Sequence, residues 1–445
     1  MIEKTKSIFL TILVILSLVL TTTINLYDFN KKSASLSEYY PQILLGDLRE
    51  IEQLIMPSDI YVHQTAGKHT ALTRGNSHYN VIYSEIKKFK FFSPVLVTED
   101  IDWYYLRNER AGIELVFATP LDADVLRLIF EQTTRSLNLQ AIDSILFSVD
   151  EKFDVEAYFI SAQNDRVYMA RTINTVPMLD LYLESLEDEP NYVYHLAGDE
   201  FQGRWVERGY YLPEGDLDVD RKVIMNLNLT ENNIVQMIFS VPSSVRTAYT
   251  LDKRDSILYT DGISSLDYNN VDQTFNYNQP IIDAQRGLSI DRELAAATKF
   301  INQHGGWDGD YVLTSASKMF DDARVALTFT MYVEGIQLYP QQVNYGQLRA
   351  EANVIIGNYQ RSTLFVDRII SSRTVSTSAS ELWGKLALAE IERNQIRDIK
   401  LAYIPRLNNN NVILDPCWLI DLGESTNLLI GIGSEEVVSS GLGKN

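Results

Sequence analysis

The residues best suited to metal binding or nucleophilic chemistry are few and widely separated in this sequence. The five histidines are His63, His69, His78, His195 and His304. No two of them have the HExxH spacing that places two zinc ligands on one helix face. His63 and His69 could approach each other across a hairpin, but polar positions of a strand usually face water, so we expect solvated side chains. The single cysteine, Cys417, lies in an apolar stretch, which favours a buried, inert thiol.

Other patterns that could support catalysis or cofactor binding fail on inspection. The sequence has no GxSxG elbow, no SxxK element accompanied by KTG, no phosphate-binding loop and no kinase signature. Asp216, Asp218 and Asp220 have the spacing that begins a calcium-binding loop. Arg221, however, stands where that loop needs glycine, and Leu227 stands where it needs a bidentate glutamate. We therefore expect no enzymatic activity, no metal and no cofactor.

Charge and aromatic residues limit the remaining ligands. The chain carries 59 acidic residues against 39 lysines and arginines, a formal net charge of −20. Such a surface repels the phosphates of nucleic acids, so a nucleic-acid partner is not expected. Trp103–Tyr105 could stack against a sugar, but three consecutive aromatic residues are more typical of a strand in a core.

An apolar segment near the N-terminus predicts where the protein is located. Residues 8–27 contain no charge, and a helix of this length rises about 30 Å, the thickness of the hydrocarbon core of a bilayer. Two lysines precede the segment, so the positive-inside rule predicts a cytoplasmic stub at residues 1–7 and an extracytoplasmic bulk. We expect a single-pass protein of the cell membrane. The alternative is a cleaved signal peptide with its apolar region at 8–20, but threonines stand where the cleavage site needs small residues.

Polar side chains within this predicted membrane helix fall on one stripe. Alternating steps of four and three residues give the stripe its members, which are Ser7, Thr11, Val14, Leu18, Thr21 and Asn25. Helices associate inside a bilayer through close packing and interhelical hydrogen bonds, which small hydroxyl residues can provide. The stripe is therefore the predicted contact face for another membrane helix. In the alternative interpretation, the hydroxyls bond back to their own helix.

The rest of the chain alternates between helical and strand patterns, which predicts an α+β fold with helices packed on antiparallel sheets. At 445 residues the chain is too long for one core. We predict an N-terminal α+β domain at 28–140, a mostly β central domain at 141–270 and a C-terminal α+β domain at 271–445.

Several individual elements follow from local patterns. Helices are predicted over residues 44–55, 79–89, 121–137, 178–186, 290–301 and 379–389. Trp103–Leu106 is predicted to be a strand, and residues 230–233 are predicted to be a hairpin loop between two strands. Tight turns are predicted at Glu334-Gly335 and at residues 408–411.

Three stretches of the sequence, taken in order, resemble one known family. They are TKSIFLTILVILSLVLTT near the N-terminus, GIELVFATPLDADVL at Gly112–Leu126, and IKLAYIPRLNNNNVILDPCW at Ile399–Trp418. The sequence resembles the YycH family over essentially the whole chain. The resemblance lies in the spacing of the three stretches, the total length, the single predicted anchor and the high tyrosine content of 25 residues. No single motif is specific, whereas the combination and its order are.

The resemblance implies a membrane-anchored accessory protein without catalytic residues. YycH proteins resemble their companion YycI in the later domains, and both regulate the essential sensor histidine kinase of the YycG/YycF (WalK/WalR) system. That system controls cell-wall metabolism in low-GC Gram-positive bacteria. The expected partners are therefore a kinase of the YycG/WalK type and a YycI-like protein. An extracytoplasmic module that binds or senses the cell wall without kinase contact is the main alternative, and a wall hydrolase is disfavoured because no nucleophile or metal set is present.

Overall fold

The computed structural model describes Ser17 and residues 43–441, apart from short internal gaps. These gaps are 99–100, 131–140, 151–153, 176–185, 187–188, 198–208, 250–255, 283, 320–323, 342–343, 410, 424–425 and 435–436. The predicted anchor and its stripe therefore lie outside the described residues, except for Ser17. Within the described residues, no helix has both the length and the apolar character needed to cross a bilayer.

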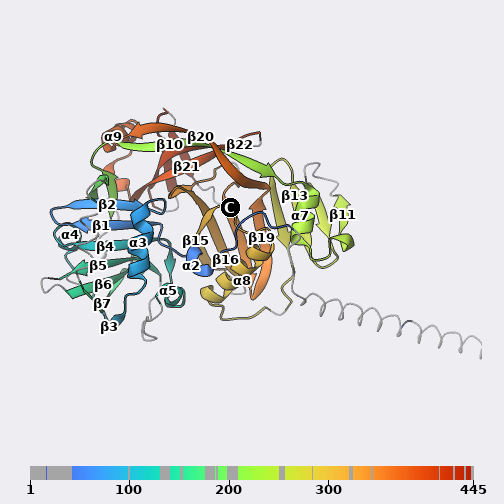
Figure 1. Cartoon of the computed structure of the whole chain (residues 1–445), viewed down its shortest axis with the longest axis horizontal. Coiled ribbons are helices and arrows are strands. Elements are labelled where there is room, and N and C mark those ends of the chain that lie inside the picture. Colours follow the sequence, from blue (N-terminus) through green and yellow to red (C-terminus); the bar gives the residue numbers. More distant parts are fainter. Residues whose placement is uncertain are drawn as a thin grey trace, which may run out of the picture.

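The first sheet is antiparallel throughout and contains nine strands in the described part of the chain (Figure 1). Its strands are β1 (Asp59–Gln64), β2 (Lys68–Thr73), β3 (Phe91–Leu96), β4 (Gly112–Leu121), β5 (Ile142–Val149), β6 (Asp154–Ser161), β7 (Arg166–Thr175), β8 (Asn191–Leu196) and β9 (Gly209–Pro213). They lie side by side in the order β3-β7-β6-β5-β4-β1-β2-β8-β9. Along β5, Ile145 and Phe147 belong to the large core, whereas Leu146 belongs to a smaller cluster with Trp103, so apolar groups cover both faces of this strand.

The second sheet contains fifteen strands within the described residues. Its strands are β10 (Leu217–Asn228), β11 (Arg246–Tyr249), β12 (Ser256–Thr260), β13 (Ser265–Asn269), β14 (Thr274–Asn278), β15 (Asp310–Lys318), β16 (Val325–Val333), β17 (Ile336–Leu338), β18 (Gln347–Asn353), β19 (Ile355–Ser362), β20 (Leu364–Thr377), β21 (Asp398–Asn408), β22 (Asn411–Asp421), β23 (Thr426–Gly431) and β24 (Val437–Gly441). The main path runs β11-β12-β13-β14-β19-β18-β16-β17-β21-β22-β10-β20, with β15 beside β16, and β23 and β24 beyond β22. The pairing of β17 with β21 is parallel, and the other described pairings are antiparallel.

Short helices pack against these sheets. They are α2 (Ile51–Leu54), α3 (Ser77–Ile86), α4 (Trp103–Asn108), α5 (Ala123–Ile129), α7 (Glu231–Ile238), α8 (Ile290–Gln303) and α9 (Ala379–Leu388), with 3-10 turns at Pro242–Ser244 and Arg393–Gln395. Figure 1 shows α3 across the first sheet and α8 beside the strands of the second. One apolar core contains residues of both sheets, and a second lies beneath α9. The structure confirms a mixed fold of helices and sheets in which strands predominate.

The helix α8 shows how the sequence produces one of these elements. Its buried residues include Leu294, Ala297 and Ile301, which is the spacing of one helix face, and the helix contacts β16, β18 and β19. Gly305 and Gly306 have φ values of 101° and 74°, so the chain leaves the helix through a left-handed conformation that glycine tolerates best. The prediction of a helix ended by these glycines is confirmed.

Three predicted elements differ from the structure. The expected strand at Trp103–Leu106 is the start of helix α4, because the Asp102 side chain accepts a hydrogen bond from the Tyr105 amide and caps the helix. The expected hairpin loop at 230–233 is instead the first turn of α7, where Thr230 and Asn233 form a capping box. The helix predicted over 44–55 is helical only at Ile51–Leu54.

The domain limits stay predictions, and their positions can be compared with the strands of the two sheets. Residue 140 lies between β4 and β5, and residue 270 lies between β13 and β14; each pair consists of hydrogen-bonded neighbours in one sheet. The described chain passes from the first sheet to the second between β9 and β10. The helix predicted over 178–186 falls almost wholly outside the described residues.

Candidate functional site

The first polar assembly is built on the β1–β2 hairpin. His63 and His69 lie directly opposite each other in the antiparallel register, and their Nδ1 atoms are 3.0 Å apart. Neither side chain is exposed to solvent, because Tyr211 of β9 and Tyr194 of β8 pack against His69. The expected approach across a hairpin is confirmed, and the expected solvation is wrong. Strands β8 and β9, more than a hundred residues later in the sequence, cover both imidazoles.

A buried ion pair continues this assembly. Arg107, in the last turn of α4, donates from Nε and Nη2 to the two carboxylate oxygens of Glu114 on β4, each at 3.1 Å. Ser144 and Tyr211 also donate to Glu114, at 3.1 and 3.3 Å. His63 Nε2 lies 3.4 Å from Glu114 Oε2, at the long limit of a hydrogen bond. The carboxylate is thus surrounded by donors, the arrangement that a buried charge requires.

These surroundings shift the pKa values of the assembly. Burial favours the uncharged form of both histidines; it lowers the pKa of His63, and burial together with the neighbouring His63 lowers the pKa of His69 to about 3. Burial also opposes ionisation of Glu114, but the Arg107 guanidinium and the hydrogen bond with His63 outweigh it and hold the carboxyl pKa below its usual range. At neutral pH the assembly therefore contains two neutral imidazoles and one paired carboxylate.

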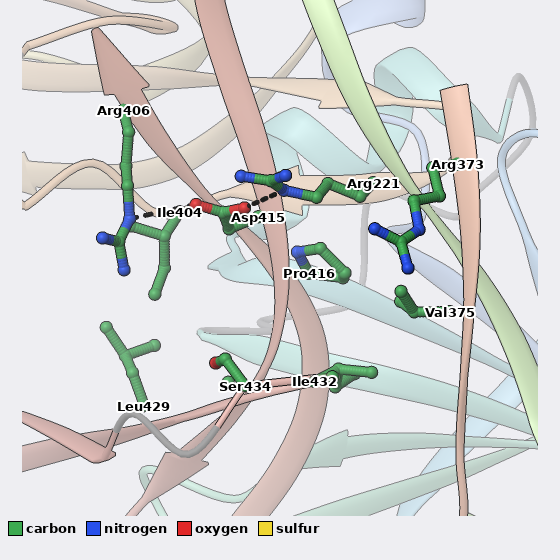
Figure 2. Close-up of a pocket in the computed structure, with 12 residues that line it drawn as sticks. Arg221, Arg373, Val375, Ile404, Arg406, Asp415, Pro416, Leu429, Ile432 and Ser434 are labelled. Carbon is green, nitrogen blue, oxygen red and sulfur yellow. Dashed lines mark hydrogen bonds and ion pairs between the residues drawn. The ribbon is translucent and has the colours of Figure 1, made fainter. Parts of the chain in front are cut away.

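The second polar assembly is a groove of about 340 Å³ on the second sheet (Figure 2). Arg221 of β10 and Arg406 of β21 both contact Asp415 of β22: Arg221 Nε lies 2.5 Å from Oδ1, and Arg406 Nε lies 3.0 Å from Oδ2. Arg373 of β20 is directly opposite Arg221 in the antiparallel register. Three guanidinium groups thus line the groove with one carboxylate among them.

The remaining walls of the groove are apolar or backbone. Figure 2 shows the three arginines in a row with Leu429, Ile432 and Ser434 across the open space from them. Lys385 of α9 donates to the carbonyl oxygens of Gly431 and Ser434 at 2.9 and 3.1 Å, so a helix fixes the segment that follows β23. The groove therefore combines cationic and apolar lining on a supported backbone, as ligand sites do.

The other residues singled out in the sequence take structural positions. Cys417 is fully buried, which confirms the prediction of its burial; burial also raises the pKa of its thiol. Trp103 is buried, whereas Tyr104 and Tyr105 are exposed on α4. Asp218 and Asp220 lie on the extended strand β10, where Asp220 accepts hydrogen bonds from Ser372 and Thr374.

Apart from the approach of His63 and His69 across the β1–β2 hairpin, neither polar assembly could be inferred from local sequence. The groove joins side chains of β10, β20, β21 and β22, and the described residues between Arg221 and Arg373 form most of the second sheet. The sequence contained one signal for a residue of the groove, which was Arg221 at the position where a calcium loop needs glycine. This arginine argued against a calcium site but did not indicate which other ligand could bind.

Comparison with known proteins shows which family has this sequence and this fold. Two family models match in order: "YycH protein, N-terminal domain" over residues 3–178 and "YycH protein, C-terminal domain" over residues 207–428. The chain belongs to the YycH family. A curated YycH relative, the "Two-component system WalR/WalK regulatory protein YycH" of Bacillus subtilis (strain 168), is 22% identical over 443 residues, or 94% of each chain. The crystal structure of YycH from Bacillus subtilis matches with a TM-score of 0.67 at 18% identity, over 89% of this chain and 99% of that one, and so shares the fold.

Proposed function

We propose that this chain is a non-catalytic accessory regulator of an essential sensor histidine kinase of the YycG/WalK type. The observation that supports this most strongly is the ordered match of both YycH family models, which together reach from residue 3 to residue 428. The Bacillus subtilis relative carries the name of a WalR/WalK regulatory protein, and it aligns with this chain over nearly its whole length. Its role is the best available guide to the role of this chain.

The proposed arrangement places residues 8–27 in the cell membrane and the two sheets outside the cell of a Gram-positive bacterium. The regulator would contact the kinase through its membrane helix and, outside the cell, act together with a YycI-like protein that its later domains resemble. The output would be control of cell-wall metabolism. The absence of enzymatic activity is part of the proposal, and the burial of His63, His69 and Cys417 supports it because none of the three can reach a substrate.

Crosslinking in intact membranes tests the proposal directly. A photoreactive residue introduced within residues 8–27 should capture the sensor kinase or the YycI-like protein, and deletion of the chain should change a reporter driven by the response regulator. If neither protein is captured and the reporter does not change, the proposal fails. Co-sedimentation of the chain with purified cell wall, without kinase capture, would favour the wall-binding alternative.

The predicted helix stripe offers a matched pair of variants for the same assay. Replacing Thr11 and Thr21 with leucine should preserve membrane insertion but weaken capture of the kinase or its companion, because interhelical hydrogen bonds are worth about 0.6–2 kcal/mol each. Replacing Ser17 and Thr22, which lie off the stripe, should matter less. Equal behaviour of the two pairs would assign the contact to the extracytoplasmic part.

A further inference from the structure

We propose that the groove lined by Arg221, Arg373 and Arg406 binds the phosphate group of an organic phosphate. The groove carries a surplus of positive charge on a molecule whose formal net charge is −20. Its charged lining consists of three guanidinium groups and one carboxylate. A cluster of positive side chains on an otherwise acidic protein creates a local positive potential, and this potential attracts an anion.

The pairing of Arg221 with Arg373 is the strongest part of the argument. The two residues are directly opposite each other on β10 and β20, a position at which like charges destabilise a sheet. Asp415 offsets only part of this repulsion. It accepts from Nε of Arg221 and of Arg406, whereas the side chain of Arg373 has no hydrogen bond or ion pair with the side chains or backbone of the described residues. An anion held between the two strands would remove the repulsion.

The neighbouring acidic residue on β10 does not neutralise the groove. Asp220 lies on the opposite face of the strand from Arg221, where Ser372, Thr374 and Lys222 hold it. These hydrogen bonds lower the pKa of Asp220 to about 2, so Asp220 is ionised and is bound on its own face, where Lys222 also pairs with Glu334. Asp220 therefore does not compete with a ligand for the guanidinium groups of Arg221 and Arg373 on the groove side.

The shape of the groove indicates the class of ligand. Guanidinium forks match both carboxylates and phosphates, but the two oxygens of a carboxylate lie in one plane with its carbon, whereas the oxygens of a phosphate are arranged tetrahedrally and can meet arginines that approach from different strands. The volume of about 340 Å³ falls in the range of small-molecule sites, and Val375, Leu429 and Ile432 add apolar lining. An organic phosphate, either a soluble polyol phosphate or the head group of a phospholipid, fits both properties.

Calorimetric titration of the full chain in uncharged detergent micelles tests the proposal. One arm adds glycerol 3-phosphate, and the other adds the same micelles doped with phosphatidylglycerol. Saturable binding in the first arm identifies a soluble phosphate, and binding in the second arm alone identifies a lipid head group. Arg373→Gln should weaken binding by about tenfold or more, because each lost charged hydrogen bond has an effect of this order.

Arg368→Gln is the matched control, because Arg368 is an exposed arginine on the same strand that does not line the groove. It should bind as the unchanged chain does. Without ligand, Arg373→Gln should melt at the same temperature or higher, since it relieves repulsion. Absence of binding in both arms, equal weakening by the two substitutions, or a lower melting temperature for Arg373→Gln would each overturn the proposal.

Discussion

The two polar assemblies that contain arginine, one around Glu114 and the other in the groove around Asp415, differ in how their charges are balanced. On the first sheet, Arg107 is almost fully buried, and a single carboxylate takes both of its parallel hydrogen bonds. On the second sheet, Arg221 and Arg406 share Asp415 while Arg373 lies beside them without a carboxylate partner among the described residues, and the side chain of Arg221 keeps 45% of its surface exposed. The first assembly is closed and its carboxylate is surrounded by donors, whereas the second is open and has more donors than acceptors.

This difference indicates that the charges of the first assembly stabilise the fold, whereas the charges of the groove are placed to bind a ligand. A buried charge whose partner is removed destabilises the protein strongly, whereas an exposed pair contributes little. The first assembly should therefore respond to substitution through stability, and the groove through binding. Four predictions test this division.

The largest effect is expected at Glu114. Glu114→Gln preserves the shape of the side chain but leaves the buried Arg107 without a counter-charge, so the free energy of unfolding should fall by about 3–5 kcal/mol. Urea denaturation of the full chain in micelles measures this. Glu156→Gln is the control, since the ion pair of Glu156 with Arg110 is longer, at 3.5 Å, and more exposed. The double substitution Arg107→Met with Glu114→Leu should cost less than Glu114→Gln alone; a larger cost would show that packing rather than charge dominates.

A second buried arginine tests whether the loss of stability depends on burial of the ion pair or on the sheet in which it lies. Arg361 of β19 pairs with Asp308 at 2.5 Å and donates to the Gly306 carbonyl at 2.8 Å, and both side chains are 2% exposed. Asp308→Asn should therefore destabilise the second sheet by a few kcal/mol. Asp415→Asn in the groove should cost about 1 kcal/mol or less, because its partners are partly exposed. Similar losses at the two positions would contradict the division between closed and open assemblies.

The buried histidines predict a loss of stability in acid. Unfolded histidine titrates near pH 6.5, whereas His69 in the folded chain has a pKa of about 3. Between these values the unfolded chain binds a proton that the folded chain does not, so stability decreases as the pH falls, by at most about 1.4 kcal/mol per pH unit for each histidine. The lowered pKa of Glu114 adds a further loss only below the ordinary range of a glutamate.

Urea midpoints at pH 7.5 and 5.5 measure this dependence. His69→Gln should reduce the slope with pH, and His78→Gln, on the partly exposed surface of α3, is the control for loss of a histidine outside the buried assembly. An unaltered slope in His69→Gln would place the acid sensitivity elsewhere in the molecule.

Elements with strong local signals were predictable from the sequence. The apolar stripe of α8, the Glu334-Gly335 turn between β16 and β17, and the turn between β21 and β22 all lie where the sequence predicts them. Trp103–Leu106 misled because aromatic composition favours strands, whereas the capping Asp102 decided the outcome. Thr230 and Asn233 misled in the same way, since a capping box and a polar hairpin loop use similar residues.

The candidate sites were not predictable, for a different physical reason. Solvation of His63 depends on β8 and β9, and the charge of the groove depends on strands that meet only in the folded sheet. Spacing along the chain carries no information on such contacts. Arg221 and Asp415 illustrate this, because they form a close hydrogen bond although 194 positions separate them in the sequence.

The smallest predicted effect examines the groove through stability alone. Arg373→Glu converts the like-charged cross-strand pair with Arg221 into an opposite-charged pair, which should raise the free energy of unfolding by about 0.2–1 kcal/mol. Salt screens charges on an exposed strand, so the gain should shrink as ionic strength rises towards 1 M. Arg368→Glu changes the net charge by the same amount and gives the reference value, because Arg368 faces Met225 in the register and not another arginine. It also removes the exposed ion pair of Arg368 with Asp367, which contributes at most about 1 kcal/mol. An equal loss of stability in both variants would reflect only the more negative net charge of an already acidic chain, whereas a gain confined to Arg373→Glu would show that the unaltered pair is held in repulsion when the groove is empty.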